Sequence, residues 1–167
     1  MDTGFSYDNF EKCITEIVNV SNKLLDGWKI ESKQDCDAKF MTKKHSTYLD
    51  GLDGSKTLVT FEYHVAYSLS YGVPVLCFNI WRQDGTMLTI EEYWSLNQSL
   101  KDSNMHDTLT QMDHPVLCRP FLTLHPCKTS EFFQPFLENS KNPVVSWLSV
   151  VGSFVHLQLL EDYIKCC

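Results

Sequence analysis

The tripeptide His125-Pro126-Cys127 is the segment of this sequence whose residue types best suit chemistry. It follows the apolar run 120–124, which has the composition of a β-strand. Proline cannot donate to a strand ladder and favours extended backbone in the residue before it, so Cys127 is expected just beyond the last paired position. Residues 128–130 could begin a helical turn there, and free N–H groups or positive charge near a thiol favour the thiolate. We therefore expect Cys127 to be reactive.

The other six cysteines have less specific surroundings. Seven cysteines at irregular spacing, in a chain without an N-terminal secretory pattern, indicate free thiols rather than a disulfide framework. The two at the C-terminus do not have the spacing of a prenylation box, in which the cysteine is fourth from the end. We interpret all six as buried or exposed thiols without a chemical role, namely Cys13, Cys36, Cys77, Cys118, Cys166 and Cys167.

Two other kinds of site use the same residue types. His114, Cys118, His125 and Cys127 lie in one segment, but structural zinc sites use ligand pairs separated by two to four residues, and His-Pro-Cys is too close and too stiff. No metal or other cofactor is therefore predicted. A thiol protease needs a histidine base near the cysteine, and His64 and His114 are candidates that the spacing does not single out. His64 is expected on the solvated face of its strand.

The elements that position Cys127 begin with an amphipathic helix. Apolar residues at helical spacing predict it over 6–26, and Gly27 provides its C-terminal stop. A short strand is predicted over 28–32. Residues 33–57 are polar and are predicted to be mostly loop, with an edge strand at 39–47.

The centre of the chain predicts a hairpin. Strict alternation of apolar and polar residues over 59–70 predicts a long half-buried strand, and the apolar run 73–81 predicts its partner after a turn. A capping box at Thr89 predicts a helix that reaches Leu100. Residues 101–113 are predicted to link this helix to the strand that carries the cysteine.

A last helix is predicted after the cysteine, with Asn142 as N-cap, Pro143 in the first turn, and Gly152 weakening it. The order of elements predicts an α+β fold, with an antiparallel sheet of about four strands and helices packed on one face. At 167 residues and 43% hydrophobic composition, the chain is expected to form a single domain over 1–167.

Composition and charge exclude some partners. The formal net charge of -7 has the wrong sign for binding phosphate backbones or anionic lipid, so no nucleic-acid partner is expected. The most apolar tract, 143–160, is interrupted by polar residues and is interpreted as a buried helix rather than a membrane span. Reduced thiols and the absence of a signal sequence predict a cytoplasmic protein.

Several segments resemble one known family. The matching segments are 63–68 (YHVAYS), 71–76 (YGVPVL), 114–115 (HP), 124–129 (LHPCKT) and 146–152 (SWLSVVG). They are similar to the autophagy-related protein ten family, the E2-like conjugating enzymes of autophagy, and they cover most of the second two thirds of the chain. The sister enzyme of the lipid-conjugation branch shares His-Pro-Cys. It usually carries a long acidic insertion that is absent here, and the tyrosine-rich hairpin favours the first assignment.

The resemblance implies an E2-like core fold and an acyltransferase activity. An E1-like enzyme would pass autophagy-related protein twelve to Cys127 as a thioester, and a lysine of autophagy-related protein five would then attack it. Ubiquitin E2 enzymes carry an asparagine upstream of their cysteine in a His-Pro-Asn motif, and here the cysteine itself takes the third place. Another donor must therefore stabilise the developing oxyanion, and His125 and Tyr71 are the candidates, if the hairpin turn lies beside the cysteine.

Other interpretations remain open at this point. A histidine in the place of His125 serves equally well to tie the strand end to the backbone, and an aromatic residue in the place of Tyr71 often does no more than pack in the turn. The chain could be an inert binding module that keeps the E2-like fold, the sister enzyme of the lipid branch, or a thiol hydrolase. The hairpin edge could also dock a partner by strand pairing.

Overall fold

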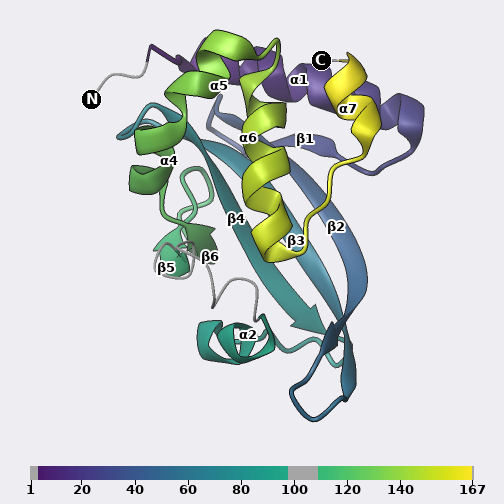
Figure 1. Ribbon diagram of the computed structural model, residues 1–167. Helices are drawn as coiled ribbons and strands as arrows, with labels where there is room; N and C mark the ends of the chain where they lie inside the picture. Colours follow the sequence, from purple (N-terminus) through teal and green to yellow (C-terminus); the bar gives the residue numbers. More distant parts are fainter. Residues whose placement is uncertain (1–3, 98–108, 167) are drawn as a thin grey trace.

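A six-stranded antiparallel sheet with helices forms the fold of this computed structural model, which describes residues 4–97 and 109–166 (Figure 1). The strands are β1 (Lys29–Ser32), β2 (Lys39–Asp50), β3 (Lys56–Ser68), β4 (Val73–Arg82), β5 (Leu109–Asp113) and β6 (Pro120–Leu124), in the spatial order β1-β2-β3-β4-β6-β5. The helices are α1 (Tyr7–Leu24), α2 (Ile90–Leu96), α4 (Pro126–Phe132), α5 (Gln134–Asn139), α6 (Pro143–Val151) and α7 (Glu161–Cys166), with a 3-10 turn η2 (Gly152–Val155). The α+β prediction is confirmed, and the sheet has six strands where about four were expected.

The predicted central hairpin is confirmed. β3 and β4 pair from Val59↔Arg82 to Ser68↔Val73, and Gly72 provides the positive φ of 62° that the turn requires. Alternation along β3 puts Phe61 on the helix side of the sheet, where it is fully buried.

The edge strand predicted at 39–47 is confirmed, and it extends three residues further than expected, to Asp50. The expectation of loop was wrong for residues 48–50 and 56–57, which are strand. β2 is a 12-residue strand that pairs with β3 from Met41↔Val65 to Asp50↔Lys56. Its second half projects beyond the helices, so polar side chains are tolerated on both faces and the strand lacks a strong period of two. Loop conformation is left to residues 33–38 and 51–55.

One face of the sheet is covered by helices. α1 begins at its N-cap Ser6, and it ends with Leu25 in the left-handed conformation, two residues before the Gly27 stop that was predicted. In Figure 1, α6 lies across the strands, and the hydroxyl of Tyr63 donates to the carbonyl of Val155 in η2 at 2.6 Å. Side chains of α1, α6 and the sheet, including Ile14, therefore form one continuous core.

The opposite face carries a smaller core under the β5–β6 connection. Its buried members are Phe40, Ala66, Val75, Cys77, Val116 and Phe121. His64 points to this face as alternation predicted, but only 2% of it is exposed, because the 114–121 segment covers it. The prediction of a solvated His64 was therefore wrong.

The C-terminal part refines three predictions. Asn142 caps α6 and Pro143 opens it as expected, but the helix stops at Val151 and continues as the 3-10 turn from Gly152. α5 and α7 were not predicted, and β5 occupies the end of the expected linker 101–113. α2 begins at the predicted capping box. Leu100, residues 101–108 and the side chains of Cys166 and Cys167 lie outside the described part of the chain.

The apolar tract 143–160 divides between α6, η2 and a following non-helical segment. None of the helices in residues 4–97 and 109–166 is both long enough and apolar enough to cross a membrane.

Candidate active site

Cys127 lies in the first turn of α4, directly after the last residues of β6. β6 ends at Leu124, His125 is the N-cap, and Pro126 is the first helical residue. Proline suits this position because the first helical N–H needs no partner within the helix. The expected strand end is confirmed, and the helix begins one residue before the cysteine. The Cys127 side chain is half-buried, so the thiol is held in place and still reachable.

His125 holds the backbone at the thiol. Its ring Nδ1 accepts the N–H of Cys127 at 3.1 Å, and its carbonyl accepts the N–H of Lys128 at 3.2 Å. A neutral imidazole that accepts at Nδ1 carries its proton on Nε2. The strand-end role and the donor role considered for His125 are therefore compatible, because one nitrogen caps the helix and the other is an N–H donor.

Ser130 also braces the helix turn that carries the thiol. Its hydroxyl donates to the carbonyl of Cys127 at 2.7 Å. Sequence reasoning did not assign this residue a role, although a serine three positions after the cysteine is the signal that could have indicated the bond. The ammonium of Lys128, next in sequence to the cysteine, forms an exposed ion pair with Glu131 at 3.7 Å, which contributes little to stability.

Tyr71 lies against His125, as the placement of the hairpin turn beside the cysteine requires. The two rings meet edge to face, with centroids 5.8 Å apart and an interplanar angle of 79°. Within the described residues, the Tyr71 hydroxyl has no hydrogen-bond partner. A hollow of about 320 Å³ separates this turn from β5, and Tyr71, Asp113 and Pro126 are among its lining residues. The hollow thus reaches Pro126, the residue before the cysteine, and Tyr71 connects it to His125.

Comparison with known proteins shows which family the chain belongs to. A family model described as "Autophagocytosis associated protein, active-site domain" matches residues 9–162. The Homo sapiens protein named Ubiquitin-like-conjugating enzyme ATG10 is 33% identical over 199 residues, covering 93% of this chain and 90% of that protein. The Arabidopsis thaliana protein of the same name is 28% identical over 166 residues, covering 92% of this chain and 72% of its own length. The chain belongs to this family of autophagic E2-like conjugating enzymes.

The fold of the autophagic E2-like family is also shared with a solved structure. The crystal structure of the autophagic E2 Atg10 aligns with a TM-score of 0.60 at 17% identity, covering 90% of this chain and 96% of that one. The relatives named above all carry the name of one branch, which agrees with the assignment made from the tyrosine-rich hairpin.

The remaining histidine candidates of this E2-like chain are already engaged. His114 Nδ1 accepts the N–H groups of Val116 and Leu117, both at 3.1 Å, so its Nε2–H donates to His64 Nδ1 at 3.2 Å. His64 Nε2–H then donates to Glu62 at 3.0 Å. All four ring nitrogens have partners, so neither histidine is a free base for Cys127.

Burial and these hydrogen bonds lower the pKa values of two groups in the network formed by Glu62, His64 and His114. Burial is the main reason why the pKa of His114 falls to about 3. The hydrogen bond from His64 is the main reason why the pKa of Glu62 falls to about 2, against the opposing effect of burial. The network therefore consists of neutral His114 and an ionised carboxylate, which suits a structural support for the β5–β6 connection.

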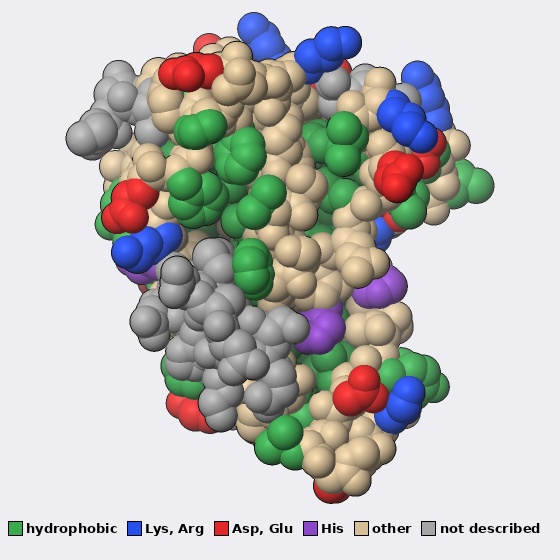
Figure 2. Space-filling model, viewed as in Figure 1, with side chains coloured by type: hydrophobic (Ala, Val, Ile, Leu, Met, Phe, Trp, Pro, Cys, Tyr) green, Lys and Arg blue, Asp and Glu red, His purple; other side chains and the backbone are tan. Residues whose placement is uncertain are grey.

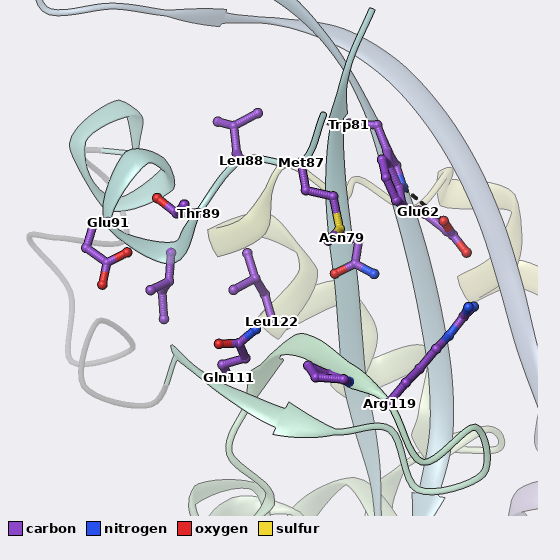
Figure 3. A pocket seen from close by; sticks show the side chains of 12 residues that line it. Glu62, Asn79, Trp81, Met87, Leu88, Thr89, Glu91, Gln111, Arg119 and Leu122 are labelled. Carbon is purple, nitrogen blue, oxygen red and sulfur yellow. Dashed lines mark hydrogen bonds between the residues drawn. The ribbon is translucent and has the colours of Figure 1, made fainter. Parts of the chain in front are cut away.

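A larger groove lies on the same face as this network (Figure 3). It measures about 590 Å³ and lies where β4 and β6 diverge after Phe78↔Leu122, with Asn79, Gln111 and Arg119 at its walls. Trp81 donates its indole N–H to Glu62 at 3.0 Å on one side. Among the described residues that line it, there is no cysteine, serine or histidine.

The cysteine and histidine pattern considered for zinc is not assembled in the structure. In residues 4–97 and 109–166, no three His, Cys, Asp or Glu side chains are placed to hold a metal ion together.

Proposed function

We propose that Cys127 carries the acyl group of a ubiquitin-like modifier as a thioester and transfers it to a lysine. In the first step, the Cys127 thiolate attacks the thioester carbonyl on an E1-like enzyme, a new S–C bond forms, and the E1 thiolate leaves. In the second step, the acceptor amine attacks, a C–N bond forms, the bond to Cys127 Sγ breaks, and the amine loses a proton to solvent. On the family resemblance, we propose autophagy-related protein twelve as the modifier and autophagy-related protein five as the acceptor.

The observation that carries this proposal is a half-buried thiol in a helix turn that two side chains brace, with an N–H donor beside it. Exchange between thioesters is nearly balanced in energy, so it needs positioning and a modest thiolate fraction rather than a strong base. The two histidines considered as a protease base, His64 and His114, are both engaged elsewhere, which suits acyl transfer better than hydrolysis by water.

Stabilisation of the oxyanion is assigned to His125 and Tyr71 in this proposal. The carbonyl oxygen of the thioester gains negative charge when the amine attacks, and one well-aimed donor is worth about 3 to 4 kcal/mol there. His125 Nε2–H and the Tyr71 hydroxyl are both donors, and their rings are in contact. They would take the place of the asparagine that ubiquitin E2 enzymes carry upstream of the cysteine.

The hollow next to Pro126 is proposed as the approach for the acceptor lysine. Its walls include apolar side chains such as Val75 and Met112. Among the described residues that line it, Asp113 is the only Asp or Glu, and there is no Lys or Arg. A lysine packs its methylene stem on apolar surface and keeps its ammonium near a carboxylate. The arrangement therefore favours a basic side chain over an acidic one.

A charging assay tests the proposal. The chain is incubated with the E1-like enzyme, ATP and the modifier, and adducts are separated with and without reductant. We expect an adduct that reductant removes, no adduct with Cys127→Ala, and a reductant-resistant oxyester with Cys127→Ser. Cys118→Ala is the matched control, because Cys118 is an exposed free thiol nine residues away, and it should charge normally. An adduct that survives Cys127→Ala would refute the proposal.

A further inference from the structure

The outer edge of β2 is unpaired along most of its length. β1 pairs only with residues from Lys39 to Thr42, whereas β2 continues to Asp50. In Figure 1, β1 stops near the helices and β2 alone borders the sheet from there to the hairpin. No strand in the described part of the chain pairs with this side of β2 from Lys43 onward.

An unpaired strand edge can form backbone hydrogen bonds with a strand of another chain. Eight residues at about 3.3 Å each make an edge of roughly 26 Å, along which alternate residues present unpaired N–H and C=O groups. Most of its side chains are exposed, namely Lys44, His45, Ser46, Tyr48 and Asp50, and Tyr48 is 60% exposed. Figure 2 shows that acidic and basic side chains both lie on the end of the sheet that projects beyond the helices. The edge is thus long, accessible and mixed in charge.

We propose that this edge is a self-association surface, on which two copies of the chain pair β2 with β2 about a two-fold axis. A two-fold axis perpendicular to the sheet makes the two strands antiparallel and gives both copies the same contacts. Along a strand, every second residue directs its N–H and C=O groups toward the same edge. Two residues that lie opposite each other and bond across the axis must therefore both be odd-numbered or both even-numbered, so that their numbers add to an even number.

Between Lys43 and Asp50, two such registers pair as many as seven residues per copy. The register centred on Ser46 brings Asp50 opposite Thr42, whose edge Lys29 of β1 already occupies. The register centred on Thr47 avoids this collision. It pairs Lys44 with Asp50, His45 with Leu49 and Ser46 with Tyr48, on both sides of the axis. We therefore assign the second register.

Charge complementarity supports this register and this occupant. A lysine on an edge strand ordinarily discourages pairing with other chains. Here each Lys44 faces an Asp50 of the other copy, so two opposite-charge pairs flank the axis. Lys43 does not oppose the contact, because its ammonium is bound to Asp26 at 2.7 Å on the helix side.

The contact is small and leaves the chemistry accessible. Seven residues per copy bury less than the roughly 800 Å² per partner of a standard interface, so we expect a weak dimer that dissociates on dilution. Cys127 follows β6, which lies on the far side of β4 from β2 in the strand order. Both Cys127 sites thus stay open at the outer ends of the paired sheets.

Sedimentation velocity over a wide concentration range tests the proposal with the full chain. We expect the mass of the unmodified chain to rise from one copy toward two with concentration. Asp50→Lys puts like charges opposite each other and should weaken the dimer at least tenfold, as should Lys44→Glu. An equimolar mixture of D50K and K44E should restore association, because every cross-strand pair is then of opposite charge. Lys33→Glu, which changes an exposed lysine away from the edge, is the control.

Folding of the variants is checked by their unfolding midpoints. Lys44 also lies across from Glu62 in β3, so Lys44→Gln replaces K44E in the mixture if K44E does not fold, and association should then recover in part. A chain that stays one copy at all concentrations overturns the proposal. A dimer that D50K leaves unchanged, or a mixture that does not recover, overturns it as well. None of these measurements depends on charging of Cys127.

Discussion

His125 combines two tasks at the residue scale through a single hydrogen bond. By accepting the N–H of Cys127 at Nδ1, it caps α4 and fixes the tautomer of its neutral ring. In the proposed mechanism, the proton on Nε2 is donated to the oxygen that gains charge beside the thiol. The bond that positions Cys127 would therefore also orient this donor. Tyr71, in ring contact with His125, is the second proposed donor.

Removing these donors should slow transfer from the preloaded thioester. We expect His125→Ala to lower the single-turnover rate of discharge to lysine by about 100-fold, equal to roughly 2.7 kcal/mol, and Tyr71→Phe to lower it by about tenfold. The rate is measured by quenching after addition of acceptor to charged enzyme. His45→Ala, an exposed histidine on β2, is the control. Unchanged rates in both variants would remove both residues from the mechanism.

At the scale of elements, Asn142 joins two helices that are far apart in sequence. Its side-chain oxygen accepts the N–H of Val145 at 3.2 Å and caps α6, while its amide nitrogen donates to the carbonyl of Cys13 at 3.0 Å in α1. The amide also donates to Glu16 at 3.1 Å. Only 2% of Asn142 is exposed, so these groups cannot turn to water if the residue is lost.

Asn142→Ala should therefore destabilise the fold by more than the loss of an exposed cap. We expect the free energy of unfolding to fall by about 2 to 3 kcal/mol, since a cap is lost and a buried carbonyl of α1 is left without its donor. Urea unfolding followed by circular dichroism measures it. Asn139→Ala, at an exposed position in α5, should cost less than about 0.5 kcal/mol. Equal costs for the two variants would contradict this account of α6.

At the scale of the whole molecule, the two faces of the sheet are stabilised in different ways. The helix side is a large apolar core, and the other side is a small core closed by the network of Glu62, His64 and His114. β6 pairs with β4 at only Cys77↔Thr123 and Phe78↔Leu122. The network therefore helps to hold the β5–β6 unit, and with it the start of α4, against the rest of the sheet.

The network makes stability depend on pH. The pKa of His114 is lowered to about 3 in the folded state, so between pH 6.5 and 3 the unfolded chain binds more protons and stability falls as pH falls. Each such proton contributes a slope of up to about 1.4 kcal/mol per pH unit. Glu62, with a pKa lowered to about 2, adds a loss of the same sign below about pH 4.5.

Unfolding by urea at a series of pH values measures this slope. His114→Asn keeps an oxygen that can accept the N–H groups of Val116 and Leu117, but it cannot titrate, so the slope between pH 6.5 and 4.5 should become flatter. His45→Gln, at an exposed position, should leave the slope unchanged. A slope that His114→Asn does not alter would show that another group is responsible.

Sequence patterns predicted the helices and strands that are amphipathic or capped. They failed where a strand is exposed on both faces, because apolar and polar residues then do not alternate. β3, β4 and α6 were found because alternation, apolar runs and a capping asparagine are local signals. The edge strand at 39–47 was found, but its last residues, 48–50, were predicted to be loop, because polar residues lie on both sides of the strand where it extends beyond the helices. β5 is short, and its outer positions Gln111 and Asp113 are exposed, which hides it in the same way.

The sequence by itself determined the local geometry at Cys127, the proposed nucleophile, because that geometry depends on its immediate neighbours: a strand end, a proline without an N–H, and a helix start. Only the tertiary structure decided what surrounds it. Tyr71 is 56 residues away in sequence, and pairing of β3, β4 and β6 brings it to His125. Burial of His64 likewise depends on the 114–121 segment folding over β3, a contact between distant residues that no local pattern encodes.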